Sequence, residues 1–255
     1  MTSARIRCQQ VRGIDVVTLV SPQNRNAMSL QMLDELLVAV ADSAAGEGRA
    51  LLLDHEGPVF CAGIDLKERR GADPDDHRHS TQLAQLLRQL WAYPGPVLCR
   101  IDGPVRGGGM GLVACADVVV ASQRASFAYS EVRVGVAPAL VAAVAFEKVA
   151  VGPLLPWLLT GEAFDALTAQ RLGLVSRVGV EAPLSVEPEL AAVIASAPVA
   201  VRTMKQLSRR AGTVGFDERL EQMQAVSAQL FASSEAREGM TAFAQRRPPA
   251  WAVSQ

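Results

Sequence analysis

The most informative part of this sequence is one glycine-rich segment, Ile101-Asp102-Gly103-Pro104-Val105-Arg106-Gly107-Gly108-Gly109-Met110-Gly111-Leu112-Val113-Ala114. An apolar run typical of a strand, 97–101, leads into a turn marked by Gly103 and Pro104, and three successive glycines then open a short apolar helix. A helix start leaves about four backbone N–H groups without intrahelical partners and carries about half a positive charge. The stretch therefore fits an anion site, for a phosphate or a developing oxyanion, and it equally fits close packing of a helix on a strand.

Two nucleotide-binding motifs can be compared with these residues. Segment 109–114 matches the dinucleotide fingerprint G-x-G-x-x-A. In that fold the glycines follow the strand directly and begin a long crossover helix, whereas here the next strand-like run, 117–122, begins almost at once. The sequence contains no G-x-x-x-x-G-K-[ST] motif. The dinucleotide match is therefore weak, and a P-loop is excluded.

Composition describes a globular chain with little net charge. Of 255 residues, 49% are hydrophobic, enough for a substantial core in one large domain or a domain with an appendage. The 25 basic and 26 acidic residues give a net charge of −1, which predicts no bulk attraction to nucleic acid or to an anionic membrane. The first residues lack an apolar signal region, and no apolar run approaches about 18 residues. We therefore expect neither export nor a membrane span.

Cysteine and histidine usage indicates neither a metal site nor a hydrolase. The four cysteines lie scattered in apolar surroundings without C-x-x-C spacing, which favours reduced thiols and a cytoplasmic location. Segment 73–79 contains H-x-H beside carboxylates, but its polarity and its proline predict a solvated loop, and a closed metal site needs about four convergent ligands. No G-x-S-x-G motif occurs, and the three histidines fall in polar segments. We expect no metal and no serine hydrolase.

Hydrophobic patterns predict strands and helices in alternation. Strands are expected at 5–8, 14–20, 50–54 and 117–122. Helices are expected after Ser29 as N-cap and at 81–91, 140–160, 199–210, 216–232 and 234–246, whereas 126–138 is predicted to be a loop. The order strand, helix, strand around 14–54 indicates a parallel βα unit, and 161–178 fits one more such turn. The last three helices should pack on the core or on another subunit.

Two further segments carry candidate functional residues. A second glycine-bearing turn, 57–66, runs into a helix-like segment, so its backbone donors could also face a ligand. Glu131 stands among small and apolar residues in segment 126–138. Its carboxylate is either a functional group or a surface charge paired with Arg133, because most carboxylates are exposed.

The order and spacing of these motifs resemble the crotonase (enoyl-CoA hydratase/isomerase) superfamily from near Val16 to Trp251. Asn24-Arg25-Asn26-Ala27-Met28-Ser29 is similar to the family's loop that contacts coenzyme A. Segments 60–68 and 102–109 are similar to its two oxyanion segments, and Ser130-Glu131-Val132-Arg133-Val134-Gly135 resembles its catalytic-acid loop. The segments 160–164 and 169–175 and the tail 243–251 also match.

This resemblance implies an α/β fold, with a crotonase-type spiral of ββα turns over residues 1–195. It also implies a helical C-terminal region, 196–255, that is used in trimerisation, and hence a homotrimer or a dimer of trimers. An apolar stripe in this region is consistent with a partner surface: Phe216, Leu220, Met223 and Leu230. The implied partner is an acyl-CoA thioester substrate. Coenzyme A is then part of the substrate, and no separate cofactor is expected.

The resemblance also implies roles for individual residues. The N–H groups of Ile64 and Gly108 would donate to the thioester carbonyl oxygen and oppose the charge of an enolate, and Glu131 would act as acid and base. The implied substrate-binding positions are Arg25, Ala27, Ala62, Asp65, Leu66, Gly107 and Gly111. Backbone donors explain why Ile64 need not be polar.

One position departs from the family's best-studied hydratases. Those enzymes place a glutamate two residues after the triple glycine, where this chain has Gly111, and hold water between it and the loop glutamate. A proton shuttle between two carbons needs only one base, so hydration and double-bond isomerisation both stay open. Glycine at position 111 also resembles the pattern of a methylglutaconyl-CoA hydratase-like subgroup. In that case Gly111 would make room for a branched acyl group. The alternative function is a CoA-ester binding protein that has lost catalysis.

Overall fold

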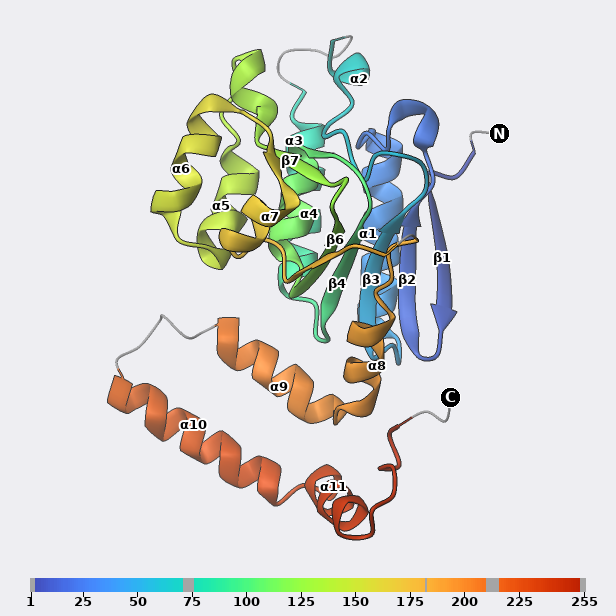
Figure 1. Ribbon diagram of the computed structural model, residues 1–255, viewed down its shortest axis with the longest axis vertical. Coiled ribbons are helices and arrows are strands. Elements are labelled where there is room, and N and C mark those ends of the chain that lie inside the picture. The colour runs from blue at the N-terminus through green and yellow to red at the C-terminus, as the bar shows by residue number, and fades with distance from the viewer. Residues whose placement is uncertain (1–2, 71–75, 182, 210–215, 253–255) are drawn as a thin grey trace. The chain divides into compact units, whose positions relative to one another are not determined.

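The computed structural model describes residues 3–70, 76–181, 183–209 and 216–252, and the chain divides into two compact units (Figure 1). The first unit comprises Met1–Tyr93 and Val97–Val186, and the second comprises Pro94–Pro96 and Glu187–Gln255. The boundary expected from the sequence lies after residue 195. In the structure, helix α8 (Glu187–Ala195) belongs to the second unit.

The main sheet of the first unit has six strands in the order β1-β2-β3-β4-β6-β9. β1 is antiparallel to β2, and every later neighbour in the sheet is parallel. Central strands of a parallel sheet are covered on both faces and therefore read as continuous apolar runs. The strands are β1 (Ile6–Val11), β2 (Ile14–Leu19), β3 (Ala50–His55), β4 (Val97–Ile101), β6 (Val118–Ser122) and β9 (Arg177–Gly179).

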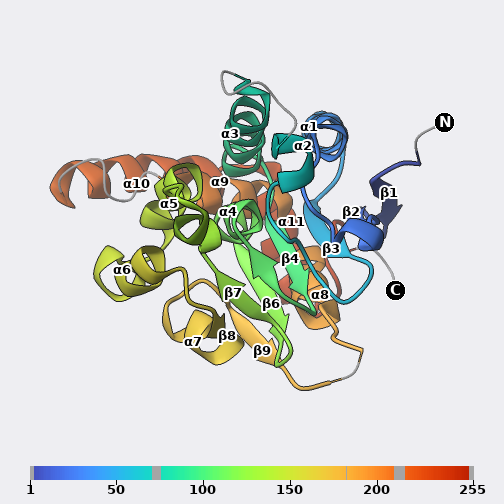
Figure 2. The ribbon, with the colours of Figure 1, turned by 90° about the horizontal axis from the view of Figure 1, so that it is seen from above.

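Helix α1 (Leu30–Ala45) connects the parallel strands β2 and β3, as the sequence predicts. The Ser29 hydroxyl accepts a hydrogen bond from the Met32 N–H at 3.2 Å, which caps the helix, and Gly46 follows its last turn. The helix buries Met32, Leu33, Leu36 and Val40. Figure 2 shows α1 beside α3 (Arg78–Trp91) on one face of the sheet.

The predicted solvated loop at 73–79 is wrong in its last residues. Residues 71–75 lie outside the described part of the chain, but α3 already begins at Arg78, and the His79 side chain is only 4% exposed. His79 precedes Leu83 by four residues, so the two side chains lie on the same face of the helix. The histidine therefore extends the buried leucine stripe of α3 by one turn.

A smaller sheet, β5-β7-β8, joins the triple-glycine segment to the segment that carries Glu131. β5 (Val105–Arg106) pairs in parallel with β7 (Ser126–Ala128), which pairs antiparallel with β8 (Phe164–Asp165). The predicted loop at 126–138 thus contains a strand and a 3₁₀ turn, η2 (Ser130–Val134). Short helices complete the unit: α2 (Leu66–Arg70), α4 (Gly108–Cys115), α5 (Ala139–Lys148), α6 (Val151–Thr160) and α7 (Ala166–Arg171).

The second unit contains the helices predicted at the end of the chain. These are α9 (Pro198–Arg209), α10 (Phe216–Phe231) and α11 (Ser234–Ala244). The Ser233 hydroxyl caps α11 by accepting a hydrogen bond from the Ala236 N–H at 3.0 Å. Helix α8 had no counterpart among the elements expected from the sequence.

Candidate active site

Backbone hydrogen bonds hold three separate loop segments together in the first unit. The Met28 N–H donates to the Gly63 carbonyl at 2.7 Å, and the Asp65 N–H donates to the Met28 carbonyl at 3.1 Å. The Arg106 N–H in turn donates to the Cys61 carbonyl at 2.9 Å. Three segments that follow the ends of β2, β3 and β4 thus form one hydrogen-bonded loop cluster: residues 24–28, 60–65 and 104–108.

This pairing leaves the Ile64 N–H free. Met28 and Ile64 form an isolated parallel bridge. In it the Met28 N–H and C=O are bonded to Gly63 and Asp65, the residues on either side of Ile64. The N–H of Ile64 itself therefore points away from Met28. Gly108 is the first residue of α4, so its N–H has no intrahelical partner either. Within the described ranges, neither N–H donates a backbone hydrogen bond in this structure.

The two turns that carry these donors touch through glycines. Gly63 and Gly107 have φ of 91° and 49°, in the left-handed region that favours glycine. A Cβ on Gly63 would lie 3.2 Å from the Arg106 carbonyl oxygen and 3.5 Å from the Gly107 Cα. A Cβ on Gly108 would lie 3.8 Å from the Ile64 Cγ1. Side chains at these glycines would separate the two turns, so the glycines bring the two free donors to the same place.

Glu131 lies against this place. Its Oε1 is 3.5 Å from the position that a Cβ on Gly107 would take. The Gly107 N–H donates to the Ala128 carbonyl at 3.1 Å, which ties the glycine turn to the end of β7, just before η2. The structure therefore brings together the three residues predicted to act in chemistry: Ile64, Gly108 and Glu131.

The Glu131 carboxyl group is partly buried, and no ion pair to it occurs in the part of the chain that the structure describes. Burial raises the pKa of this carboxyl group, because desolvation disfavours the charged form. Its Oε2 is buried and has no hydrogen-bond partner among the described residues. Arg133, the partner considered from the sequence, donates from Nε to the Thr160 carbonyl at 3.2 Å instead. A desolvated carboxyl group with a raised pKa and one oxygen without a partner is suited to proton transfer.

The coenzyme A loop predicted from the sequence forms one side of this region. The Ala62 N–H donates to the Arg25 carbonyl at 3.1 Å, while the Arg25 side chain is exposed. Ala27 is buried, Asp65 accepts from the Lys67 N–H at 3.0 Å, and the Leu66 side chain is 52% exposed. Arg25, Ala27, Ala62 and Asp65 therefore belong to the hydrogen-bonded loop cluster, and Leu66 follows it as the first residue of α2.

Gly111 is surrounded by side chains on its Cβ side. A Cβ there would lie 2.7 Å from the Leu87 Cδ2 of α3 and 3.0 Å from the Val141 Cγ1 of α5. Both neighbours are almost fully buried. Glycine at this position therefore lets Leu87 of α3 and Val141 of α5 pack directly against α4, and a larger residue would displace these side chains.

Several residues that support the site were missed by the sequence reasoning. Asn26 is buried at φ 51°, and its amide nitrogen donates to the Glu56 carbonyl at 3.0 Å and the Val59 carbonyl at 2.8 Å. His79 Nε2 lies 3.1 Å from the Glu68 carboxylate, which also accepts from the Leu30 N–H at 2.9 Å. Both pairings join segments distant in sequence, so no local pattern could show them.

A basic residue caps the far end of the glycine helix. The Lys148 ammonium donates to the carbonyls of Val113, at 2.9 Å, and Ala116, at 2.6 Å. Positive charge at a helix C-terminus complements the macrodipole of α4, whose positive end lies at Gly108. Lys148 thus stabilises the helix orientation that presents the Gly108 N–H.

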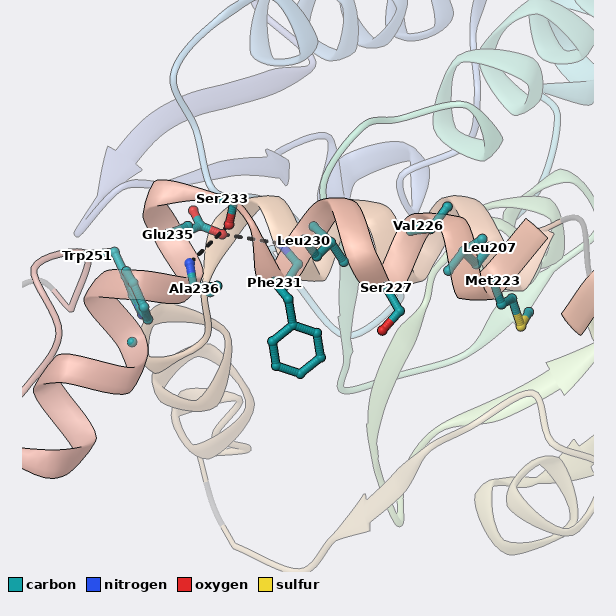
Figure 3. A pocket seen from close by; sticks show the side chains of 13 residues that line it. Leu207, Met223, Val226, Ser227, Leu230, Phe231, Ser233, Glu235, Ala236 and Trp251 are labelled. Carbon is teal, nitrogen blue, oxygen red and sulfur yellow. Dashed lines mark hydrogen bonds between the residues drawn. The ribbon is translucent and has the colours of Figure 1, made fainter. Parts of the chain in front are cut away.

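The second unit contains an apolar groove between its helices (Figure 3). Met223, Val226 and Leu230 of α10 line it together with Leu207 of α9 and Trp251. Two residues of the predicted stripe thus lie in the groove, Leu220 is 54% exposed, and the side chain of Phe216 lies outside the described residues. The groove carries no group of titratable residues that indicates chemistry.

Metal binding and membrane insertion can be assessed over the same described ranges. There, no set of three or more His, Cys, Asp or Glu residues is placed to hold a metal ion. None of the helices described is both long enough and apolar enough to cross a membrane.

Known proteins resemble this chain over almost its whole length. Residues 9–254 match the family described as Enoyl-CoA hydratase/isomerase. Human enoyl-CoA hydratase domain-containing protein 3, mitochondrial, is 34% identical over 264 residues, which cover 98% of this chain and 83% of the relative. An enoyl-CoA isomerase/hydratase of Mycosarcoma maydis is 31% identical over 254 residues, with 94% and 93% covered. The crystal structure of an enoyl-CoA hydratase/isomerase from Marinobacter aquaeolei matches with a TM-score of 0.90 at 29% identity and covers 98% of this chain and 99% of its own.

Proposed function

The chain belongs to the enoyl-CoA hydratase/isomerase family, whose enzymes act on acyl-CoA thioesters, and we propose that it stabilises a thioester enolate with Ile64, Gly108 and Glu131. One observation carries this proposal. Two free backbone N–H groups lie on touching glycine turns, and a partly buried carboxyl group, whose Oε2 has no partner among the described residues, lies against the same turns. Hydrogen-bond donors beside a base suit a reaction in which negative charge develops on a carbonyl oxygen.

In this proposal the thioester oxygen accepts hydrogen bonds from the Ile64 and Gly108 N–H groups. These hydrogen bonds become stronger as the carbonyl becomes an enolate. Loss of one such donor typically lowers the catalytic rate about 10²–10³-fold. The positive end of α4 adds to the same field. The exposed Arg25 guanidinium supplies positive charge for a phosphate of coenzyme A. The acyl-CoA is bound along the positions predicted from the sequence: Arg25, Ala27, Ala62, Asp65, Leu66 and Gly107.

Glu131 then moves the proton. For isomerisation, the carboxylate removes a proton from C2 of a 3-enoyl thioester, the C3–C4 double-bond electrons delocalise into a dienolate, and the carboxylic acid returns the proton to C4. For hydration, the carboxylate takes a proton from water as the water oxygen adds to C3 of a 2-enoyl thioester, and the carboxylic acid then returns that proton to C2 of the enolate. Both reactions use the same oxyanion donors.

The site has one carboxylate at the reacting position. Burial raises the pKa of Glu131, and no second carboxylate among the described residues contributes to that shift. Isomerisation needs no more than this single group, whereas hydration requires it also to orient water. Gly111 favours a second candidate, a CoA-ester binding protein without turnover, because this position supplies no second carboxylate.

A substrate panel distinguishes these functions. The full-length protein is incubated with 2-enoyl-, 3-enoyl- and branched enoyl-CoA esters, and products are followed by mass spectrometry. A mass gain of one water shows hydration, and a shifted double bond at unchanged mass shows isomerisation. Tight binding of these esters without any product supports the binding protein and contradicts the enzymatic proposal.

We further propose that the second unit packs on other subunits in a homotrimer or a dimer of trimers. Large apolar side chains are exposed there, including Leu220, Phe231 and Phe243, the last at 87%. Exposed apolar surface that is contiguous marks protein interfaces, and these three side chains supply large apolar areas for one. Sedimentation velocity at micromolar concentration should show trimers or hexamers, and a stable monomer would contradict the proposal.

The cysteines are consistent with a reducing compartment, for which we propose the cytoplasm. Cys61, Cys99 and Cys115 are buried, and burial raises the pKa values of the Cys61 and Cys99 thiols to about 12. Such thiols are inert. Fractionation of the native cells tests the location.

A further inference from the structure

Tyr129 is a buried polar residue that the proposed chemistry leaves unexplained. It lies between β7 and η2, two residues before Glu131, and its side chain is 0% exposed. Its ring stacks against Phe164 with centroids 6.5 Å apart, and Phe164 in turn contacts Phe127 and Trp157. The aromatic packing therefore fixes where the phenol lies.

The hydroxyl group of Tyr129 has no hydrogen-bond partner among the described residues. Leaving a buried hydroxyl unpaired is unfavourable, and a phenylalanine would fill the same space without that penalty. Unpaired buried polar groups in native structures call for a functional explanation. Packing alone accounts for the ring and not for its oxygen.

The complementary group lies on the same turn. Glu131 Oε2 is also buried and unpaired, while Oε1 lies beside Gly107. The two residues are separated by one residue in the chain, and the pKa of the phenol is raised by burial first and then by the negative charge of Glu131. Tyr129 offers a donor where the carboxylate lacks one, and catalytic hydrogen bonds are often long before substrate binds.

We propose that Tyr129 is a positioning residue for Glu131, whose hydroxyl donates to the buried Oε2 when the carboxylate is charged and so keeps Oε1 at the reacting carbon. This inference rests on the proposed function of Glu131. A hydrogen bond to the charged form favours that form and counteracts desolvation. The hydrogen bond therefore lowers the pKa of Glu131, which burial raises.

Tyr129→Phe removes only the hydroxyl from the full-length protein. Turnover of the substrate found by the panel should fall about 10–100-fold with KM nearly unchanged, because the base is misplaced while binding is not. The acidic limb of the kcat profile should move to higher pH. The melting temperature should stay the same or rise, since an unpaired buried hydroxyl is lost.

Phe164→Leu is the matched control, because it loosens the same ring packing and keeps the hydroxyl. It should lower the melting temperature and leave the acidic limb in place. Infrared titration of the Glu131 carboxyl band, assigned by its loss in Glu131→Gln, measures the same shift without turnover. An unmoved Glu131 titration in Tyr129→Phe overturns the inference. Full activity in Glu131→Gln overturns the proposed function instead.

Discussion

The Nε2 atom of His55 accepts a hydrogen bond from the Asp102 N–H at 3.0 Å. This bond joins the end of β3 to the turn after β4, from which the triple-glycine segment begins. His55 is 5% exposed, and its ring meets Phe60 edge-on at 5.4 Å. An imidazole nitrogen that accepts a hydrogen bond carries no proton, so the ring is neutral in this arrangement.

This bond predicts a loss of stability in mild acid. Burial lowers the pKa of His55, and the nearby Arg100 adds to that effect, whereas Asp54 and Asp102 oppose it. The unfolded chain, with a histidine pKa of about 6.5, therefore binds a proton that the folded chain does not. The free energy of unfolding should be constant above about pH 7 and fall as the pH drops below 6.5, by at most about 1.4 kcal/mol per pH unit from this group.

His55→Gln isolates the contribution of this histidine. The glutamine oxygen can accept from the Asp102 N–H but does not titrate. Urea denaturation at pH 7.5 and pH 5.0 should therefore show a smaller difference for the variant than for the natural chain. Equal differences would mean that His55 is not responsible for the acid dependence.

Lys148→Met should destabilise the first unit by about 1–3 kcal/mol, the usual loss for hydrogen bonds to a charged group. The variant keeps the length of the side chain but leaves the carbonyls of Val113 and Ala116 without the ammonium donor. Urea denaturation measures the effect, with the exposed neighbour Glu147→Gln as control. An effect below about 0.5 kcal/mol, as at ordinary surface positions, would contradict the capping role.

Gly111→Ala should cost about 1–3 kcal/mol through overpacking, because the new Cβ meets Leu87 and Val141. The penalty should shrink when Leu87→Ala is present, since the shortened side chain no longer reaches the new methyl group. Additive losses in this double-mutant cycle would show that the contact is not the cause. Gly111→Glu should be still less well tolerated, so it is a poor way to restore a second carboxylate.

Local patterns predicted the frame of the molecule. Ser29 caps α1 as expected, and the apolar run at 50–54 is a central strand, because capping and continuous burial are properties of neighbouring residues. The same reasoning placed His79 in a loop. Its burial depends on the face of α3 that packs in the core, which its polar neighbours in sequence do not reveal.

The candidate site was predictable only in its backbone. Glycines at 63 and 107 signal positive φ and close approach, so the turns were identified correctly. The alternatives for Glu131 could not be separated from the sequence, because the choice of Thr160 as partner of Arg133 depends on a contact with α6. The unpaired hydroxyl of Tyr129 was invisible for the same reason, since only the folded chain shows which polar atoms lack partners.

The decisive test of the proposed chemistry is Glu131→Gln. Glutamine keeps the shape of the side chain, and its position against Gly107 needs no charge, but an amide cannot exchange a proton with the acyl chain. Turnover should therefore fall about 10²–10⁴-fold, the contribution of one positioned acid or base, while binding of the CoA ester stays nearly unchanged. Steady-state kinetics and calorimetric titration measure the two quantities separately. Weaker binding with normal turnover per bound ester would assign Glu131 to recognition, and wild-type values for both would remove it from the site.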